Sequence, residues 1–330
     1  MADATRRSQL LGLKLAALVR DHVGSEPTSP PVPGLWPGGA ALLRDGAAWI
    51  LLEDEPSRAV GRGLAWAQQQ GATLLHLLAE SGSGVLARKA AYFSEPPQVW
   101  HINGRALVEA IPEPFPDAAA VDPELAVFAD LIVDGGAVPV VEHGVLAGEV
   151  MGLEVCRAVR DPYTDECRLE VGVGAHDREA FLLIHGGIPT VEALRMVVEA
   201  VARHRAPGAD PHPLNRLGAE RALRARLIEQ PVLVGASSLL PAEPPVARAN
   251  LKDAVPCVAL GNSNDGTPLV VVCSTGIDLD IVPWAADARE YLCPDADLVI
   301  AQPERDISPV THAIAGMLRK SVRIVSIPAA

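Results

Sequence analysis

Residues 73–79 read TLLHLLA and residues 297–303 read DLVIAQP, two short apolar runs in opposite halves of the chain. Each run has the length and the apolar content of a buried parallel strand. Each is followed by a segment with helical periodicity, VLARKAAYF in residues 85–93 and THAIAGMLR in residues 311–319. A short strand follows each helix. This alternation of strands and helices predicts an α/β fold.

The residues that precede each run extend the same pattern. In the N-terminal part, residues 40–44 and 47–53 are predicted strands joined by Asp45-Gly46, a strong hairpin signal. Residues 60–70 predict a helix that ends at Gly71. The C-terminal part repeats this order, with predicted helices at 214–228, 282–290 and 309–319 and strands at 256–260, 269–273, 297–301 and 322–327.

The repeated order predicts two similar mixed-sheet modules and an internal duplication. The alternative is that two unrelated α/β modules share an alternating order by chance. Segments rich in proline and glycine divide the chain at 25–39, 112–123, 207–213 and 241–250. We therefore expect an N-terminal module (1–110), a middle segment (111–206) that is separate or part of the first domain, and a C-terminal module (207–330).

Composition restricts the class of protein. The 330 residues carry 28 Lys and Arg against 41 Asp and Glu, a net charge of −13 that disfavours nucleic acid as the main partner. The five cysteines contain no CxxC and are odd in number, as expected for reduced thiols in the cytoplasm. Lys14 interrupts the apolar N-terminal segment, which predicts an amphipathic helix and no signal peptide. No membrane span is predicted, and four lysines against abundant arginine and alanine are typical of a bacterial protein.

The C-terminal module carries a family resemblance. Asp253 precedes its first strand, an Asp265-Gly266 turn follows, and the next strand reads PLVVVCS. The order of elements, a helix, a β-meander and then αβαβ, resembles that of the restriction-endonuclease-like nuclease superfamily. The resemblance implies an Asp in the meander and an acidic-x-Lys triplet on the following strand, which place a divalent metal and a lysine against the scissile phosphate.

Both modules depart from that catalytic motif. The strand end Val272-Cys273-Ser274-Thr275 has neither the acid nor the lysine. In the N-terminal module the matching end, Leu52-Glu53-Asp54-Glu55, has the acid, but Glu55 stands where the lysine belongs. The resemblance thus implies two degenerate copies and a non-catalytic binding or scaffold protein.

The middle segment supports a different function. Nine acidic residues and three histidines lie between Glu142 and His185, and carboxylates with occasional histidine suit Mg²⁺ or Mn²⁺. The candidate metal ligands are Glu142, His143, Glu149, Glu154, Glu170, His176 and Asp177. The alternative function is therefore a divalent-metal-dependent phosphodiesterase or nuclease, with Glu154, Glu170 and Asp177 as candidate catalytic residues.

The competing interpretation of the same residues is structural. Two strands, 153–159 and 167–173, flank a DPYTDE turn and predict a β-hairpin, which a helix follows. If Arg160 faces Cys167, Arg157 lies opposite Glu170 and Glu154 points to the other face. The acids would then be solvated and neutralised by the arginines of the segment, Arg157, Arg160, Arg168 and Arg178.

A second candidate cleft lies in the C-terminal module. Asp278 and Asp280 follow one predicted strand, and Glu304-Arg305-Asp306 follows the next. Parallel strands would bring these groups to one sheet edge, where an enzyme could act on a small metabolite. Asp278 and Asp280 are thus further candidate catalytic residues. The alternative is helix capping by Asp280 and by Asp306 or Ser308.

One predicted helix carries the densest basic cluster, Arg216, Arg221 and Arg224. It could contact nucleic acid or an acidic partner. The alternative is a solvated helix face, on which Glu220 and Arg224 form an i,i+4 pair. A protein partner or a second copy of the chain remains open, as does enzymatic activity itself.

Overall fold

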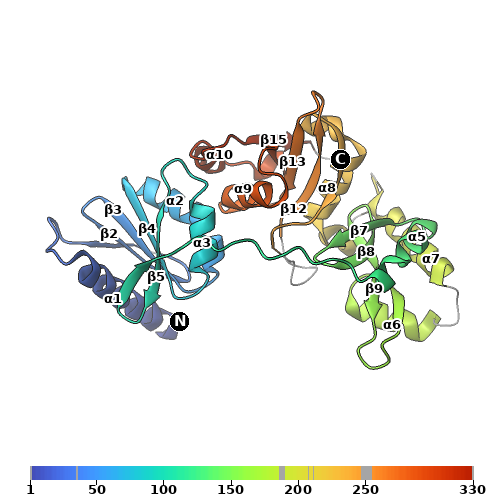
Figure 1. The fold of residues 1–330 in the computed structure, drawn as a ribbon, viewed down its shortest axis with the longest axis horizontal. Helices are drawn as coiled ribbons and strands as arrows, with labels where there is room; N and C mark the ends of the chain where they lie inside the picture. Colours follow the sequence, from blue (N-terminus) through green and yellow to red (C-terminus); the bar gives the residue numbers. More distant parts are fainter. Residues whose placement is uncertain are drawn as a thin grey trace. The chain divides into compact units, whose positions relative to one another are not determined.

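The computed structural model describes residues 2–34, 36–185, 190–206, 208–210, 212–246 and 255–328. Three sheets and the helices around them form an α/β protein, as predicted (Figure 1). Asp253, part of the predicted meander, lies outside the described residues. No helix in the described ranges is long and apolar enough to cross a membrane.

The chain divides into two compact units. The first comprises Met1–Phe115, Ile277–Asp287 and Ser308–Val322, and the second comprises Pro116–Gly276, Ala288–Ile307 and Arg323–Ala330. The first boundary falls within the predicted proline-rich break at 112–123. The division into an N-terminal module, a middle segment and a C-terminal module stays a prediction about independent folding.

The first unit contains a six-stranded sheet. Its strands, in spatial as well as sequence order, are β1 (Val32–Gly34), β2 (Gly39–Arg44), β3 (Ala47–Leu52), β4 (Leu74–Ala79), β5 (Gln98–Asn103) and β6 (Ala106–Glu109). The pairs β3–β4 and β4–β5 are parallel, and the others are antiparallel. Asp45 and Gly46 turn between β2 and β3 with φ of 51° and 80°, a left-handed turn that favours Asp-Gly. The predicted hairpin is confirmed.

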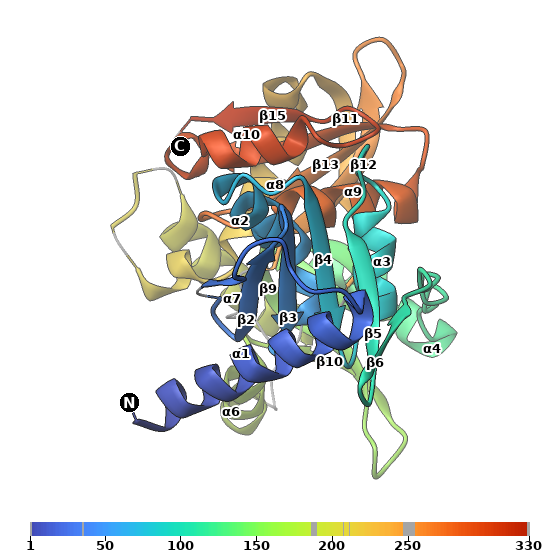
Figure 2. The same ribbon diagram turned by 90° about the vertical axis from the view of Figure 1, so that its left-hand side faces the viewer.

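Helix α1 (Ala2–Val23) covers one face of this sheet (Figure 2). Its apolar stripe follows the helical period, so that Leu11, Leu15 and Leu18 are buried together with Trp49 and Leu51. Helix α2 (Val60–Gln69) follows β3 after the short helix η1 (Pro56–Arg58), and α3 (Ser83–Ala90) follows β4.

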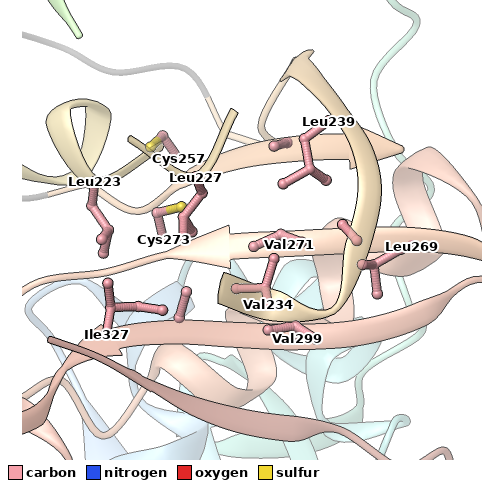
Figure 3. Packing of buried hydrophobic residues seen from close by; sticks show 13 residues of the cluster. Leu223, Leu227, Val234, Leu239, Cys257, Leu269, Val271, Cys273, Val299 and Ile327 are labelled. Carbon is pink, nitrogen blue, oxygen red and sulfur yellow. The ribbon is translucent and has the colours of Figure 1, made fainter. Parts of the chain in front are cut away.

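A five-stranded sheet belongs to the second unit. It has the order β11 (Ala236–Ala242), β12 (Cys257–Ser263), β13 (Pro268–Cys273), β14 (Asp297–Pro303) and β15 (Arg323–Ile327). Helix α8 (Ala219–Glu229) precedes it, α9 (Ile281–Leu292) follows β13, and α10 (Pro309–Ala315) follows β14. Leu223 and Leu227 of α8 share a buried cluster with alternate residues of β12 and β13 (Figure 3).

The two sheets have the same topology over five strands. In each, the first two neighbouring pairs are antiparallel and the next two are parallel. In each, leaving short 3-10 helices aside, one α-helix precedes the first strand and a single α-helix joins strands three to four and four to five. The repeated element order of the sequence therefore extends to strand order and direction. Strand β11 was not predicted, because its sequence ASSLLPA alternates poorly and contains proline.

A pair of backbone hydrogen bonds within the first unit joins equivalent positions. Phe93 and Leu318 lie three residues beyond the ends of α3 and α10 and form an antiparallel bridge. The N–H of Ser94 donates to Met317 O, and the N–H of Arg319 donates to Tyr92 O, each at 2.9 Å. The contact is reciprocal, as in any antiparallel pair.

The middle segment forms a four-stranded antiparallel sheet in the second unit. Its order is β10 (Cys167–Val171), β9 (Leu153–Arg160), β8 (Val145–Val150) and β7 (Val138–Glu142). Helices α4 (Pro123–Ala126) and α5 (Phe128–Asp134) precede it, and α6 (Ala175–His185) and α7 (Thr190–Arg205) follow. The predicted hairpin is confirmed with its register, since Cys167 pairs with Arg160 and Glu170 with Arg157. Strands β7 and β8 enlarge it.

A β-bulge interrupts the pairing of β8 with β9. Gly148 pairs with Cys156, but Glu149 pairs with Glu154, so that Val155 is an extra residue. In a regular strand Glu154 and Arg157 would point to opposite faces. The bulge turns both side chains to one face, and the prediction that Glu154 points away from Arg157 is therefore wrong.

Candidate functional site

The structure brings together three of the predicted metal ligands. Glu142 ends β7, Glu149 lies in β8 and Glu154 lies in β9, on neighbouring strands of the middle sheet. Glu149 and Glu154 are buried and lie directly opposite each other. Two like charges in this position destabilise a sheet unless cations separate them.

Helix α8 supplies two of the compensating cations. Arg224 donates from Nη1 to Glu142 Oε1 at 2.7 Å and from Nη2 to Glu149 Oε2 at 3.1 Å. Arg221 Nη1 lies 3.2 Å from Glu149 Oε1 and 3.8 Å from Glu154 Oε2. One guanidinium therefore stands between the two opposed carboxylates.

Glu154 has two further arginine partners. Arg157 forms a bidentate pair with it, from Nε to Oε1 at 2.8 Å and from Nη2 to Oε2 at 2.9 Å. Arg178, at the start of α6, donates from Nη1 to Oε1 at 3.1 Å. We name these seven residues the Glu–Arg cluster: Glu142, Glu149, Glu154, Arg157, Arg178, Arg221 and Arg224.

The charges of the cluster keep Glu142 ionised. Burial alone would raise the pKa of its carboxyl, but the adjacent charges of Arg224 and Arg221 outweigh burial and hold the pKa below its ordinary value. The arginine responds in the opposite sense: desolvation alone would lower the pKa of Arg224, but Cys257 and then the carboxylates of Glu149 and Glu142 raise it. Glu142 is therefore not poised to act as a general acid near neutral pH.

The cluster is a compensated network and lacks the character of an open metal site. Its three carboxylates face four guanidinium groups, so a divalent cation would have to displace arginines before it could bind. Within the ranges that the structure describes, no group of three or more His, Cys, Asp and Glu side chains could hold a metal ion.

The remaining candidates of the middle segment lie apart from the cluster or at its margin. Glu170 pairs with Arg168 at 2.8 Å and approaches Arg178 Nε at 3.5 Å. His176 and Asp177 are exposed, and Asp177 accepts a hydrogen bond from the N–H of Val173 at 2.6 Å. Asp177 thus closes the turn into α6.

His143 occupies the turn between β7 and β8. Its φ of 51° lies in the left-handed region, its N–H donates to Glu243 at 2.6 Å, and its Nδ1 lies 3.7 Å from the same carboxylate. Tyr291 also donates to Glu243, and burial, followed by this hydrogen bond, raises the pKa of Tyr291 to about 12. His143 therefore belongs to a second polar contact, separate from the Glu–Arg cluster.

Asp278 and Asp280 lie in the first unit, at the start of α9. Asp278 accepts from Arg58 Nη2 at 2.7 Å. Asp280 accepts from the N–H of Gly61 at 2.9 Å and from Arg62 Nε at 3.1 Å. Burial raises the pKa of Asp280, and the Gly61 hydrogen bond opposes that rise. Asp278 therefore contacts η1, and Asp280 contacts the start of α2.

A second ionic contact in the first unit was not predicted. Asp287 of α9 is fully buried and accepts from Arg88 Nε at 2.9 Å and from Tyr92 Oη at 2.8 Å. Beside it, desolvation lowers the pKa of buried Lys89, which donates to Ser57 O at 2.8 Å. We name the pairs formed with Asp278, Asp280 and Asp287 the Arg–Asp contacts. Sequence alone could not pair charges so distant along the chain.

The other residues of the predicted C-terminal cleft belong to the second unit. Glu304, Arg305 and Asp306 form a short helix after β14, and Asp306 accepts from the N–H of Gly276 at 2.9 Å. Ser308, in the first unit, accepts from the N–H of Thr311 at 3.1 Å and caps α10, as the capping alternative predicted.

The solvated basic face predicted for α8 is wrong. Arg224 is 1% exposed and Arg221 is 8% exposed, and both belong to the Glu–Arg cluster. The side chain of Arg216 lies outside the described residues. The signal was present in the sequence, because Glu220 and Arg224 share the i, i+3, i+4, i+7 stripe with Leu223 and Leu227. A charged residue within an apolar stripe indicates a buried pair.

Described residues of the first unit line three of its hollows. Two of them, of about 620 and 520 Å³, share Trp36 and Pro37. Trp66 and Arg62 line the larger, and the Arg62 guanidinium stands 5.8 Å from the Trp36 ring centroid. The third, of about 540 Å³, lies between α2 and the start of β5. The residues that line them include none of the acids predicted to bind a metal or to act in catalysis.

Comparison with known proteins adds no relative. No family model, no curated protein and no solved structure matches the chain.

Proposed function

We propose that the protein is a non-catalytic binding or scaffold protein, built from two duplicated, degenerate modules of the nuclease-like type. The first support is the topology of the two sheets, which agree in strand order, strand direction and helix placement over five strands. The second is the absence of an acidic-x-Lys triplet at the strand ends Leu52-Glu53-Asp54-Glu55 and Val272-Cys273-Ser274-Thr275.

The observation that carries the proposal is the state of the candidate acids. Glu142, Glu149 and Glu154 accept hydrogen bonds from buried arginines, and none of them lines the three hollows described in the first unit. A catalytic carboxylate needs a free oxygen for a metal, a water or a substrate. Carboxylates that join strands to helices in this way stabilise the fold. The function that we propose is therefore the binding of a partner.

Calorimetric titration with Mn²⁺ tests the proposal. We expect no saturable heat from the full-length chain, because the arginines already neutralise the carboxylates. The same protein should leave supercoiled DNA and single-stranded RNA intact in the presence of Mn²⁺ or Mg²⁺. Two variants complete the design: Glu154→Ala with Glu170→Ala in the candidate site, and the matched control Glu166→Ala, whose side chain is exposed on the same hairpin.

The opposite result would establish a metal-dependent phosphodiesterase. That result is a saturable Mn²⁺ signal with nucleic-acid cleavage, present in the wild type and in Glu166→Ala and lost in the double variant. Circular dichroism of each variant would show whether the loss reflects unfolding. Glu170→Gln provides a milder second variant, because Glu170 is half-buried and makes fewer ion pairs than Glu154.

A further inference from the structure

Two cysteines of the second unit lie directly opposite each other. Cys257 begins β12 and Cys273 ends β13, and the antiparallel register pairs them. Both are free thiols, 2% and 0% exposed, and a side-chain hydrogen bond links them. Both side chains belong to the buried cluster under Leu223 and Leu227 (Figure 3).

This register satisfies the geometry of a disulfide. Opposed residues of an antiparallel pair have Cα atoms about 4.5–5.5 Å apart and side chains on one face. Disulfides span Cα separations of about 4.4–6.8 Å. The two sulfur atoms could therefore be joined without a change of register.

The surroundings of the pair differ from a purely apolar core. The buried guanidinium of Arg224 interacts electrostatically with both thiols. The contact with Cys257 and then burial raise the pKa of Cys273 well above its ordinary value, and the charge of Arg224 opposes that rise. The same arginine binds Glu142 and Glu149, so the thiols adjoin the Glu–Arg cluster.

We propose that Cys257 and Cys273 form a reversible oxidation site that hydrogen peroxide converts to an intramolecular disulfide. One thiol attacks the peroxide, the O–O bond breaks, the sulfur gives up two electrons to become a sulfenic acid, and water leaves. The second thiol attacks the sulfenic sulfur, the S–S bond forms, and its proton leaves with the hydroxyl as a second water. A dithiol reductant restores both thiols.

The other cysteines provide internal controls. Cys156 is 0% exposed, and burial raises its pKa to about 12. Within the described strands its register partners are Gly148 and Val171, so it has no thiol opposite. Cys167 and Cys293 are half-buried and accessible to alkylation before the oxidant is added.

Thiol counting with mass mapping tests the site. Iodoacetamide first blocks Cys167 and Cys293 in the folded full-length chain, which leaves three free thiols. After peroxide treatment and denaturation we expect one free thiol, at Cys156, and a linked pair of peptides containing Cys257 and Cys273. Reduction should return the count to three. Retention of all three thiols, oxidation to sulfinic acid without linked peptides, or a disulfide to Cys156 would overturn the proposal.

Two cavity-forming variants separate local oxidation from unfolding. Leu227→Ala removes cover from the face that carries both thiols, whereas Val270→Ala removes a buried side chain from the opposite face of β13. We expect Leu227→Ala to form the disulfide several-fold faster than Val270→Ala. Equal rates in the two variants would mean that the disulfide forms from the unfolded chain and would also overturn the proposal.

Discussion

The Glu–Arg cluster of the second unit and the Arg58–Asp278 pair of the first unit use the same chemistry at different depths. Arg224 is 1% exposed and binds Glu149, which is buried, and Glu142, whose side chain is 12% exposed. In contrast, the side chain of Arg58 is 41% exposed and that of its partner Asp278 is 25% exposed. Buried pairs are costly to break because the remaining charge has no solvent, whereas exposed pairs contribute little. Depth therefore decides which contacts hold the fold together.

The two regions also differ in how charge is distributed along the chain. In the first unit every cation of the Arg–Asp contacts comes from residues 58–88 and every anion from residues 278–287. This segregation disfavours the pairing of either segment with a copy of itself. In the second unit the three acids of the cluster come from β7, β8 and β9, and its cations come from β9, α6 and α8.

The largest expected effect follows from breaking the deepest pair. Arg224→Ala removes the deeper of the two arginines that Glu142 and Glu149 share, the other being Arg221, and should lower the free energy of unfolding by about 3–5 kcal/mol. Urea denaturation followed by far-ultraviolet circular dichroism measures the change. Arg226→Ala is the matched control on α8, because its guanidinium binds only the exposed Pro328 carbonyl among its described contacts. Equal losses for the two variants would contradict the role of depth.

Protonation offers a way to weaken the first unit alone. His76 is stacked on Trp49 at 3.6 Å and accepts a hydrogen bond from Trp100 Nε1 at 3.1 Å. Burial, with a smaller contribution from His22, lowers the pKa of His76 from 6.5 to about 4. The folded state therefore keeps its full stability above pH 6.5 and loses it as the pH falls toward 4, by at most about 3 kcal/mol.

Tryptophan fluorescence isolates that effect, since all five tryptophans, Trp36, Trp49, Trp66, Trp100 and Trp284, belong to the first unit. Urea midpoints from fluorescence should decrease between pH 6.5 and 4. In His76→Phe, which keeps a ring against Trp49 but binds no proton, this decrease should disappear. A decrease of the same size in the variant would place the titrating group elsewhere.

Acid should affect the Glu–Arg cluster at lower pH than it affects His76. The folded-state pKa of Glu142 lies below its ordinary value of 4.5, so its contribution is complete above pH 4.5 and is lost as the pH falls through the folded pKa. The slope for one proton is at most about 1.4 kcal/mol per pH unit. Far-ultraviolet circular dichroism should show a steeper loss of stability below pH 4.5 in the wild type than in Glu142→Gln. Parallel curves would contradict the assignment.

The sequence predicted those parts of the fold that apolar periodicity specifies. The runs at 73–79 and 297–303, the Asp45-Gly46 turn and the hairpin of β9 and β10 were all recognisable, because each is a pattern local in sequence. Strand β11 was missed because its polar residues break the alternation.

The candidate site was only half predictable for a physical reason. The density of acids in 142–185 identified Glu142, Glu149 and Glu154, but not the direction in which they point. For Glu154 that direction depends on the bulge at Val155, and a bulge leaves no clear pattern in a single sequence. The cations that neutralise these acids come partly from α8, so the assignment of Arg221 and Arg224 to solvent was wrong.

The smallest effect is expected for the exposed pair of Arg58 and Asp278. Arg58→Ala removes the 2.7 Å pair with Asp278, but solvent reaches both groups and screens their charge. The free energy of unfolding should fall by about 0.2–1 kcal/mol, measured by tryptophan fluorescence in urea, and the difference from wild type should shrink as salt is added. The contradicting result is a decrease in the free energy of unfolding that is independent of salt and comparable to that of Arg224→Ala. Burial would then not determine the strength of an ion pair in the first unit, and the segregation of charge between residues 58–88 and 278–287 would.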